Sequence, residues 1–248
     1  MKIFLPPSET KRPGGTGTAL AVASLALPRL SSARMTVLDA LIELSQDPAE
    51  ARRVLRLSER QLDDIVHNAA LREAPTMPAV DRYTGVLYDA LDADTLSTPA
   101  RRWLKQHVWI HSAPFGPIGA LDAIPNYRLA AGTSIPGMPP LRRHWAAATS
   151  DAIAGEGPAF VLDLRSEAYV ALGPIPATVP SAYVRVVTGQ GKALNHFNKK
   201  AKGELVRALA EDRPRARSLP ALQSWAAERG IVLRDSDAAD VVELVVAD

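Results

Sequence analysis

The sequence predicts an α+β fold in which helices flank a central β-sheet. Short apolar runs at residues 1–5, 159–164 and 181–188 are typical of strands. Between them lie stretches whose apolar residues recur at helical spacing. The chain has 248 residues, of which 47% are hydrophobic and 23% charged. This is the balance of an ordinary soluble protein that can bury a full core.

The first strand, residues 1–5, ends at two prolines. The loop that follows, residues 6–17, is rich in proline and glycine but lacks the Gly-Lys-Ser/Thr ending of a phosphate-binding P-loop. A capping box of Ser58 and Gln61 is expected to open the last of three helices. Those helices are predicted over residues 35–44, 48–55 and 59–71.

Two further helices are expected over residues 81–91 and 99–106. Residues 107–112 contain a Val-Trp-Ile core and are expected to form a strand. On a strand, His107 and His111 lie roughly 13 Å apart, too far to share one metal ion. We therefore expect no metal site there.

A long irregular segment is expected at residues 113–128, and loops of this length in a compact domain are often functional. It holds one carboxylate, Asp122, and ends in Tyr127 and Arg128. Two interpretations stay open for these residues. Asp122 caps a turn or acts in a site, and Arg128 pairs with it or binds a ligand.

A helix is expected at residues 140–153, followed by an apolar strand at 159–164. Asp163 lies near the end of that strand, and Ser166 follows in a polar turn. Strand ends of this kind are common positions for sites in sheets flanked by helices. No Gly-x-Ser-x-Gly elbow surrounds Ser166, which argues against a hydrolase nucleophile.

The strand expected at 181–188 leads into Gly189-Gln190-Gly191, which lacks the third glycine of a dinucleotide fingerprint. We therefore expect no NAD, and no other cofactor is indicated. No repeat or linker divides residues 1–248. The last expected elements are a helix ended by Gly230 and two strands, at residues 219–229, 231–234 and 241–246.

Basic charge is concentrated late in the chain. Residues 192–217 contain eight Lys or Arg against three Asp or Glu, although the whole chain carries only +2. On a helix over residues 195–210, four residues share one narrow stripe. Gly203 is costly in a helix and would leave room for a substrate, a phosphate or another backbone. This stripe, which indicates an anionic partner or else a solvated helix face, consists of His196, Lys200, Gly203 and Arg207.

The absence of cysteine excludes disulfides, thiol nucleophiles and Cys-ligated metals. An apolar run at residues 19–27 superficially resembles a secretory signal, but a strand and a proline-rich loop precede it. The run is also far shorter than the roughly 20 residues that span a bilayer. We therefore expect an intracellular, cytoplasmic protein with no membrane partner.

Several segments together resemble the YaaA family of bacterial peroxide-stress proteins. They occur in family order along nearly the whole chain, and this joint order is more specific than any one of them. The segments are FLPPSETK at 4–11, YTGVLYDAL at 83–91, residues 112–129, the helix of Trp145, LDLRSEAY at 162–169 and HFNKKAKGELVR at 196–207.

The resemblance implies a single cytoplasmic domain with a central mixed sheet and a positively charged cleft. It also implies a role in limiting free iron and in binding DNA, partly through a helix-hairpin-helix-like element near residues 55–68. That segment has no hairpin glycine and carries Asp63 and Asp64, which repel phosphate. The residues expected to bind the anion are Lys11, Arg82, Tyr83, Tyr127, Arg128, Lys192, Asn195, Lys199, Lys200, Lys202, Gly203 and Arg207.

Three functions are considered. The first is a stress protein that binds double-stranded DNA through phosphate contacts. The second is an enzyme acting on a nucleotide or other small phosphorylated ligand, and whether the chain is an enzyme stays open. Its candidate catalytic residues are His196, Asp122, Asp163 and Ser166. The third, iron scavenging by Asp235, Asp237 and Asp240, matches no recognised ligand spacing.

Overall fold

The computed structural model describes residues 1–191 and 198–246. Its centre is a seven-stranded mixed sheet with the order β4-β3-β1-β6-β7-β9-β8. The predicted α+β fold is confirmed. The strands are β1 Lys2–Leu5, β3 Val108–Ser112, β4 Gly116–Gly119, β6 Val161–Asp163, β7 Ser181–Thr188, β8 Val232–Asp235 and β9 Val241–Val246.

The five inner strands are parallel, and the two edge strands, β4 and β8, are antiparallel to their neighbours. In β1, Ile3 pairs with Val108 on one side and Leu162 on the other. Ile3, Phe4 and Leu5 are fully buried. Continuous apolar runs are typical of strands covered on both faces, which is why residues 1–5 contain no alternating polar positions.

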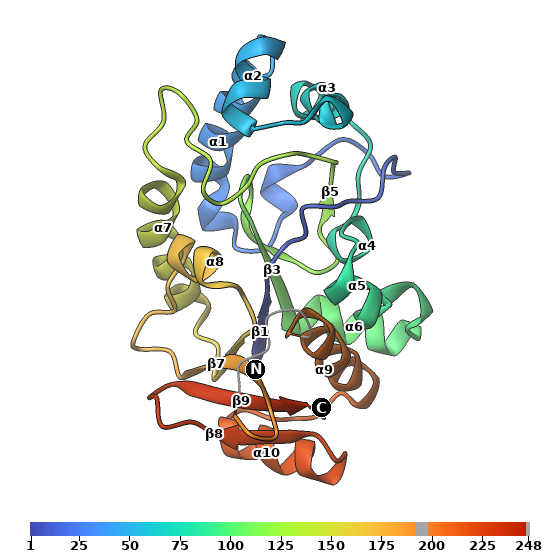
Figure 1. Ribbon diagram of the computed structural model, residues 1–248, viewed down its shortest axis with the longest axis vertical. Helices are drawn as coiled ribbons and strands as arrows, with labels where there is room; N and C mark the ends of the chain where they lie inside the picture. The colour runs from blue at the N-terminus through green and yellow to red at the C-terminus, as the bar shows by residue number, and fades with distance from the viewer. Residues whose placement is uncertain (192–197, 247–248) are drawn as a thin grey trace.

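Helices cover the sheet on two sides (Figure 1). On one side lie α5 (Val86–Leu91), α6 (Thr98–His107) and α9 (Asn198–Asp212). On the other lie α7 (Leu141–Glu156) and α8 (Glu167–Leu172). A further helix, α10 (Leu219–Glu228), packs on the edge strand β8.

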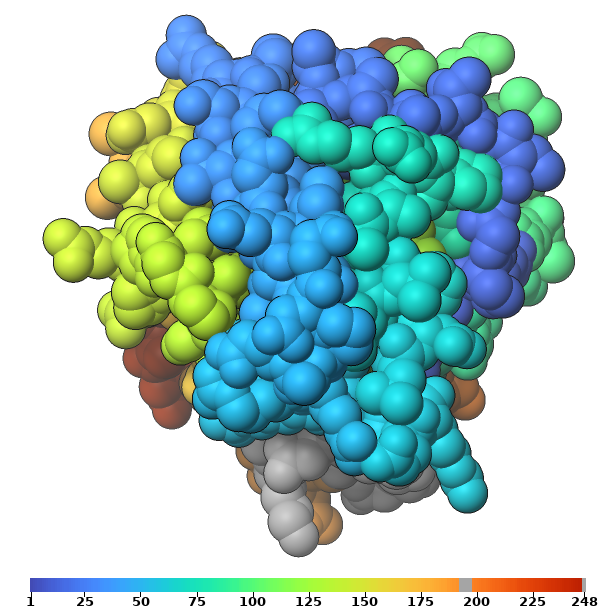
Figure 2. All heavy atoms as spheres, turned by 90° about the horizontal axis from the view of Figure 1, so that it is seen from above, coloured from blue at the N-terminus to red at the C-terminus, as the bar shows by residue number. Residues whose placement is uncertain are grey.

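The N-terminal third of the chain forms a cap at one end of the sheet (Figure 1), and in Figure 2 its blue and cyan segments make up much of the visible face. Together with Ala123–Ile124 from later in the chain, it forms a two-stranded antiparallel sheet. Single-turn 3₁₀ helices occur at Val22–Ser24, Pro28–Leu30, Glu59–Gln61 and Ala93–Thr95. The other elements of this region are α1 Ser31–Leu44, α2 Pro48–Leu55, α3 Asp63–Ala69, β2 Met77–Pro78, α4 Ala79–Arg82 and β5 Ala123–Ile124.

Two predicted helices are interrupted. The helix expected at 81–91 breaks into α4 and α5 because Gly85 has φ +97°, outside the helical region. The helix expected at 59–71 begins as a 3₁₀ turn, where the predicted capping box of Ser58 and Gln61 is present. The segment 113–128, expected to be irregular, contributes β4 and β5.

The order of strands reverses between β1 and β6. From β1 the chain crosses to β3 and β4 on one side, then returns to β6 on the other. In open sheets with parallel strands, ligands bind outside the carboxyl ends of the strands at such a switch point. Among the described helices, none has the length and apolar character needed to cross a membrane.

Candidate functional site

A cleft opens at this switch point, where β1 and β6 end. Its volume is about 790 Å³. One wall is the segment after β1, from Pro6 to Thr10, and a second is the segment after β6. The start of α5, Tyr183 of β7 and the first turns of α9 complete the lining. Five segments that are distant in the sequence therefore meet around one opening.

The β1 side of the cleft carries a small group of hydroxyls. The Ser8 and Thr10 hydroxyls lie 3.2 Å apart, and Thr10 Oγ1 donates to the Thr84 carbonyl at 3.1 Å. Gly85 follows directly, and a Cβ there would lie 3.2 Å from the Thr10 hydroxyl. Tyr88 holds the segment after β1 in place, because its hydroxyl donates a hydrogen bond to the Pro6 carbonyl at 2.7 Å.

The α9 wall carries two lysines in different environments. Lys199 is exposed at the rim, whereas Lys202 is buried. The Lys202 Nζ donates to the Leu164 carbonyl at 3.1 Å and lies 5.4 Å from the centre of the Tyr183 ring. Burial, opposed by the charge of Asp163, lowers the pKa of Lys202 to about 8.

Behind the β1 wall lies a cluster of a lysine and two tyrosines. The Lys11 Nζ lies 4.1 Å from the Tyr127 ring centre and 5.7 Å from that of Tyr83. The two tyrosine hydroxyls are 2.8 Å apart. Burial, and then the charge of Arg128, lower the pKa of Lys11 to about 7. Arg128 itself contacts the Glu9 carboxylate at 3.3 Å.

Comparison with known proteins identifies the family. The sequence model described as peroxide stress protein YaaA matches residues 1–229. The chain belongs to this family. The predicted resemblance is therefore confirmed.

Curated relatives of this YaaA family member carry the description UPF0246 protein. The one from Corynebacterium efficiens is 47% identical over 216 residues, covering 85% of each chain. One from Corynebacterium glutamicum is 42% identical over 241 residues, covering 95% of this chain and 96% of its own. One from Streptomyces coelicolor is 41% identical over 216 residues, covering 84% and 82%.

Asp163, a candidate catalytic residue, is engaged in a buried ion pair. Its carboxylate accepts from Arg165 Nε at 2.8 Å and from Nη2 at 2.5 Å. Arg165 also contacts His111 Nδ1 at 2.8 Å, and all three side chains are buried. Because both Asp163 oxygens are occupied, this carboxylate is not free to act as a base. The geometry supports a structural role at the end of β6.

Asp122, another candidate, is held in a turn away from the cleft lining. Its Oδ2 accepts from the backbone N–H of Ala26 at 2.6 Å and of Gly119 at 2.8 Å. Burial raises the pKa of Asp122, and these two hydrogen bonds oppose the rise. Of the two open interpretations, the turn-capping one describes what the structure shows. Arg128 pairs with Glu9 rather than with Asp122.

Arg82, expected to bind an anion, is completely buried. Its guanidinium donates to the carbonyls of Arg12 at 2.6 Å, Ile124 at 3.1 Å and Pro75 at 3.3 Å. The side chain therefore joins three loops, and its donors do not face solvent. An external phosphate has no access to it.

The cationic stripe expected on α9 is divided by packing. Lys200 is exposed and lies 3.5 Å from Glu204. Gly203 is buried against Leu87 of α5. Arg207 is also turned toward α5, where it reaches the Leu91 carbonyl. The predicted room at Gly203 is therefore occupied by another backbone, one of the three occupants that the sequence allowed.

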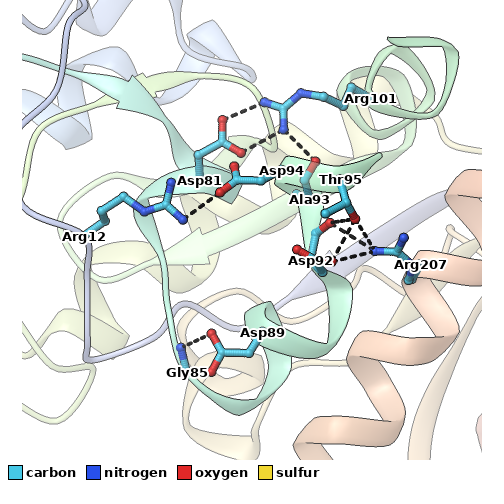
Figure 3. A network of polar contacts seen from close by, with 10 residues as sticks. All are labelled: Arg12, Asp81, Gly85, Asp89, Asp92, Ala93, Asp94, Thr95, Arg101 and Arg207. Carbon is cyan, nitrogen blue, oxygen red and sulfur yellow. Dashed lines mark hydrogen bonds and ion pairs between the residues drawn. The ribbon is translucent and has the colours of Figure 1, made fainter. Parts of the chain in front are cut away.

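Arg207 caps the carboxyl end of α5. Its Nη1 donates to the Asp92 carbonyl at 3.1 Å and to Thr95 Oγ1 at 3.0 Å (Figure 3). The same nitrogen donates to the Leu91 carbonyl at 3.1 Å. The same guanidinium lies 3.4 Å from the Asp92 carboxylate. Cations favour the carbonyl end of a helix, so this contact stabilises α5 against α9.

Ser166 lines the cleft at the start of α8, and its candidate role there stays a prediction. The predicted residues Lys192, Asn195 and His196 lie outside the described residues. Sequence reasoning missed the hydroxyls of Ser8, Thr10 and Thr84 that line the cleft. Gly85 was an available signal, because a glycine inside an apolar helical pattern often marks a break or a close approach.

Proposed function

We propose that this YaaA family member acts in the response to peroxide by binding a compact anionic ligand in the cleft. A nucleotide or another small phosphorylated molecule fits this description. The proposal is carried by one observation: the cleft at the strand switch point has Lys199 and Lys202 on a single wall. The resemblance adds that this binding serves to limit iron-driven oxidative damage.

The size and the charges of the cleft support a compact ligand. Small-molecule sites usually measure about 300–1,000 Å³, and the cleft of about 790 Å³ lies in that range. A DNA duplex requires cations exposed in a row along its backbone. Arg82 and Lys202 are buried, and Arg207 is bound to carbonyls, so these three are poorly placed for a duplex.

The test compares two neighbouring lysines. Thermal unfolding of the full chain is measured with AMP, ATP or inorganic phosphate, since a ligand that binds only the folded state raises the melting temperature. We expect Lys199→Ala to reduce the shift, because Lys199 lines the cleft. Lys200→Ala removes the same charge outside the lining and leaves the shift unchanged. Equal losses in both variants would contradict the proposed site.

The role in the peroxide response has its own test. A strain that lacks this protein is complemented with the wild-type chain, Lys199→Ala or Lys200→Ala, and survival in hydrogen peroxide is measured together with free intracellular iron. We expect Lys199→Ala alone to fail in both measurements. Full complementation by Lys199→Ala would separate the cleft from the stress response.

Double-stranded DNA is the second candidate partner. Arg213, Arg215 and Arg217 are all exposed just after α9. The pKa of the Met1 amine is lowered by burial, by Lys2 and by Arg217, which places Arg217 near the amino end of β1. The cleft lies at the carboxyl end of β1. Arg217 is therefore separate from the cleft, and in this proposal Arg213 and Arg215 extend the same basic surface.

This surface is tested by retardation of a DNA duplex at increasing salt. Phosphate contacts release counterions, so affinity that depends on them falls steeply with salt. Replacing Arg213, Arg215 and Arg217 with alanine is expected to weaken retardation and reduce the salt dependence. The same variant is expected to retain the nucleotide-dependent thermal shift. Unchanged retardation would remove these arginines from consideration.

A further inference from the structure

Lys202 is placed in the cleft as a buried amine. Its side chain belongs to the cleft wall, yet only 4% of the residue is exposed. Within the part of the chain that the structure describes, Nζ donates to the Leu164 carbonyl at 3.1 Å. Across the described residues, no carboxylate oxygen lies within ion-pair distance of this nitrogen. An ammonium in such a position lacks the charge partner that burial normally requires.

The groups around Lys202 explain this lack of a partner. The acid whose charge acts on it is Asp163, but Arg165 occupies both of its oxygens. The centre of the Tyr183 ring lies 5.4 Å from Lys202 Nζ. Lys199 precedes Lys202 by about one turn of the same helix. Burial lowers the pKa of Lys202 to about 8, so about a tenth of the amine is unprotonated at pH 7 and about half at pH 8. Desolvated lysines of this kind serve as nucleophiles.

We propose that Lys202 is a nucleophilic amine that condenses with the carbonyl group of a phosphorylated aldehyde or ketone bound in the cleft. This inference rests on the proposed function, because Lys199 at the rim would hold the phosphate while Lys202 meets the carbonyl. It adds a substrate class and a catalytic residue to that site.

The chemistry balances without an oxidant or reductant. The lone pair of neutral Nζ forms a bond to the carbonyl carbon, and the π electrons move to the oxygen, which takes up one of the two Nζ protons. The resulting carbinolamine loses its hydroxyl group and the second Nζ proton as water, and a neutral C=N bond remains. The Leu164 carbonyl accepts a hydrogen bond from Nζ and so limits rotation of the amine.

Lys11 is the alternative amine near the cleft, and its pKa is also lowered, to about 7. Two features argue against it. Its Nζ lies 4.1 Å from the Tyr127 ring centre, an arrangement that stabilises the charged ammonium. It also donates to the Glu9 carbonyl at 3.2 Å and is absent from the cleft lining.

The test traps the imine on the intact wild-type chain. The protein is incubated with glycolaldehyde phosphate at pH 8, reduced with sodium cyanoborohydride and digested, and the adduct is located by mass spectrometry. An ordinary lysine is almost fully protonated at this pH, so we expect modification of Lys202 to exceed that of exposed Lys200 by about tenfold or more. Adducts concentrated on Lys11, Lys199 or Lys200 would overturn the proposal.

Two controls complete the test. Lys202→Met retains a long apolar side chain without the amine, and we expect the adduct to be lost in a variant that keeps the wild-type circular dichroism spectrum. Unphosphorylated glycolaldehyde is expected to modify Lys202 more slowly, and Lys199→Ala to remove this difference. If both aldehydes modify Lys202 equally, the result supports Lys202 as a reactive amine but contradicts the anion-binding site at Lys199. The two proposals can therefore fail separately.

Discussion

Gly203 of α9 packs directly against the backbone of Leu87 in α5. A Cβ on Gly203 would overlap the Leu87 carbonyl oxygen and come within 2.9 Å of the Ala90 Cβ. Four residues later, Arg207 reaches the Leu91 carbonyl, also four residues on in α5. The two helices therefore run in the same direction with matched spacing, and this contact places Lys199 and Lys202 at the cleft.

Replacing Gly203 with alanine tests this contact. Alanine is favoured over glycine by about 1 kcal/mol in an open helix. Here the added methyl group meets backbone, and overpacking of this kind costs about 1–3 kcal/mol. We expect Gly203→Ala to lower the free energy of unfolding, measured with urea. Gly132→Ala is the control, because no neighbouring atom lies within 4 Å of its added Cβ. A stabilised Gly203→Ala would show that the helices do not touch there.

Loss of the Arg207 cap is expected to destabilise the same pair of helices. Hydrogen bonds from a charged donor contribute about 1.5–3 kcal/mol, and the two N–H groups of Arg207 Nη1 are shared among three acceptors. Arg207→Gln should therefore lower the free energy of unfolding by an amount in that range. Lys200→Gln, on an exposed part of α9, should change it by less than about 0.5 kcal/mol. Similar effects in the two variants would refute a capping role.

The buried pair of Asp163 and Arg165 is expected to be sensitive to removal of one partner. Asp163→Asn leaves a buried guanidinium without its counter-charge, and such changes cost about 3–5 kcal/mol. Asp151→Asn, on the exposed side of α7, serves as the matched control. Urea unfolding of both variants measures the difference. A loss under about 1 kcal/mol in Asp163→Asn would mean that the ion pair is not closed in solution.

Stability is expected to depend on pH through Lys202. Its pKa in the folded protein is about 8, below the 10.5 of an ordinary lysine side chain. Between these values the unfolded chain binds more protons than the folded one, so stability rises as pH increases from 8 towards 10. Below pH 8 both states are protonated and this contribution is constant.

The comparison of the wild-type chain with Lys202→Met isolates this effect. Lys11 titrates in an overlapping window but is present in both proteins, so its contribution cancels in the difference. We expect the free energy of unfolding of the wild-type chain, relative to that of the variant, to increase between pH 8 and 10. A pH-independent difference would show that Lys202 titrates normally.

Much of the fold could be predicted because it depends on local pattern. The apolar runs at residues 1–5, 159–164 and 181–188 correspond to β1, β6 and β7. Gly230, with φ +68°, follows the end of α10 as expected. Helix boundaries near Gly85 were harder, because an apolar pattern continues through the break. Glycine at that position was the only local sign of it.

The candidate site could be predicted only in part. Periodicity identifies which residues share a helix face, but it does not show what covers that face. Lys200, Gly203 and Arg207 looked equivalent on the stripe. In the structure, Gly203 and Arg207 pack against α5, whereas Lys200 is exposed to solvent. Lys202 lay off the stripe and turned out to line the cleft.

The sequence by itself determined the strands, most of the helices, the family and the local excess of basic charge, because each depends on residue type and short-range spacing. Only the tertiary structure decided which cations remain accessible. Whether a lysine is a surface charge or a buried amine depends on the elements packed against it, and those elements come from distant parts of the chain. Lys199 and Lys202, three residues apart on one helix, differ for this reason.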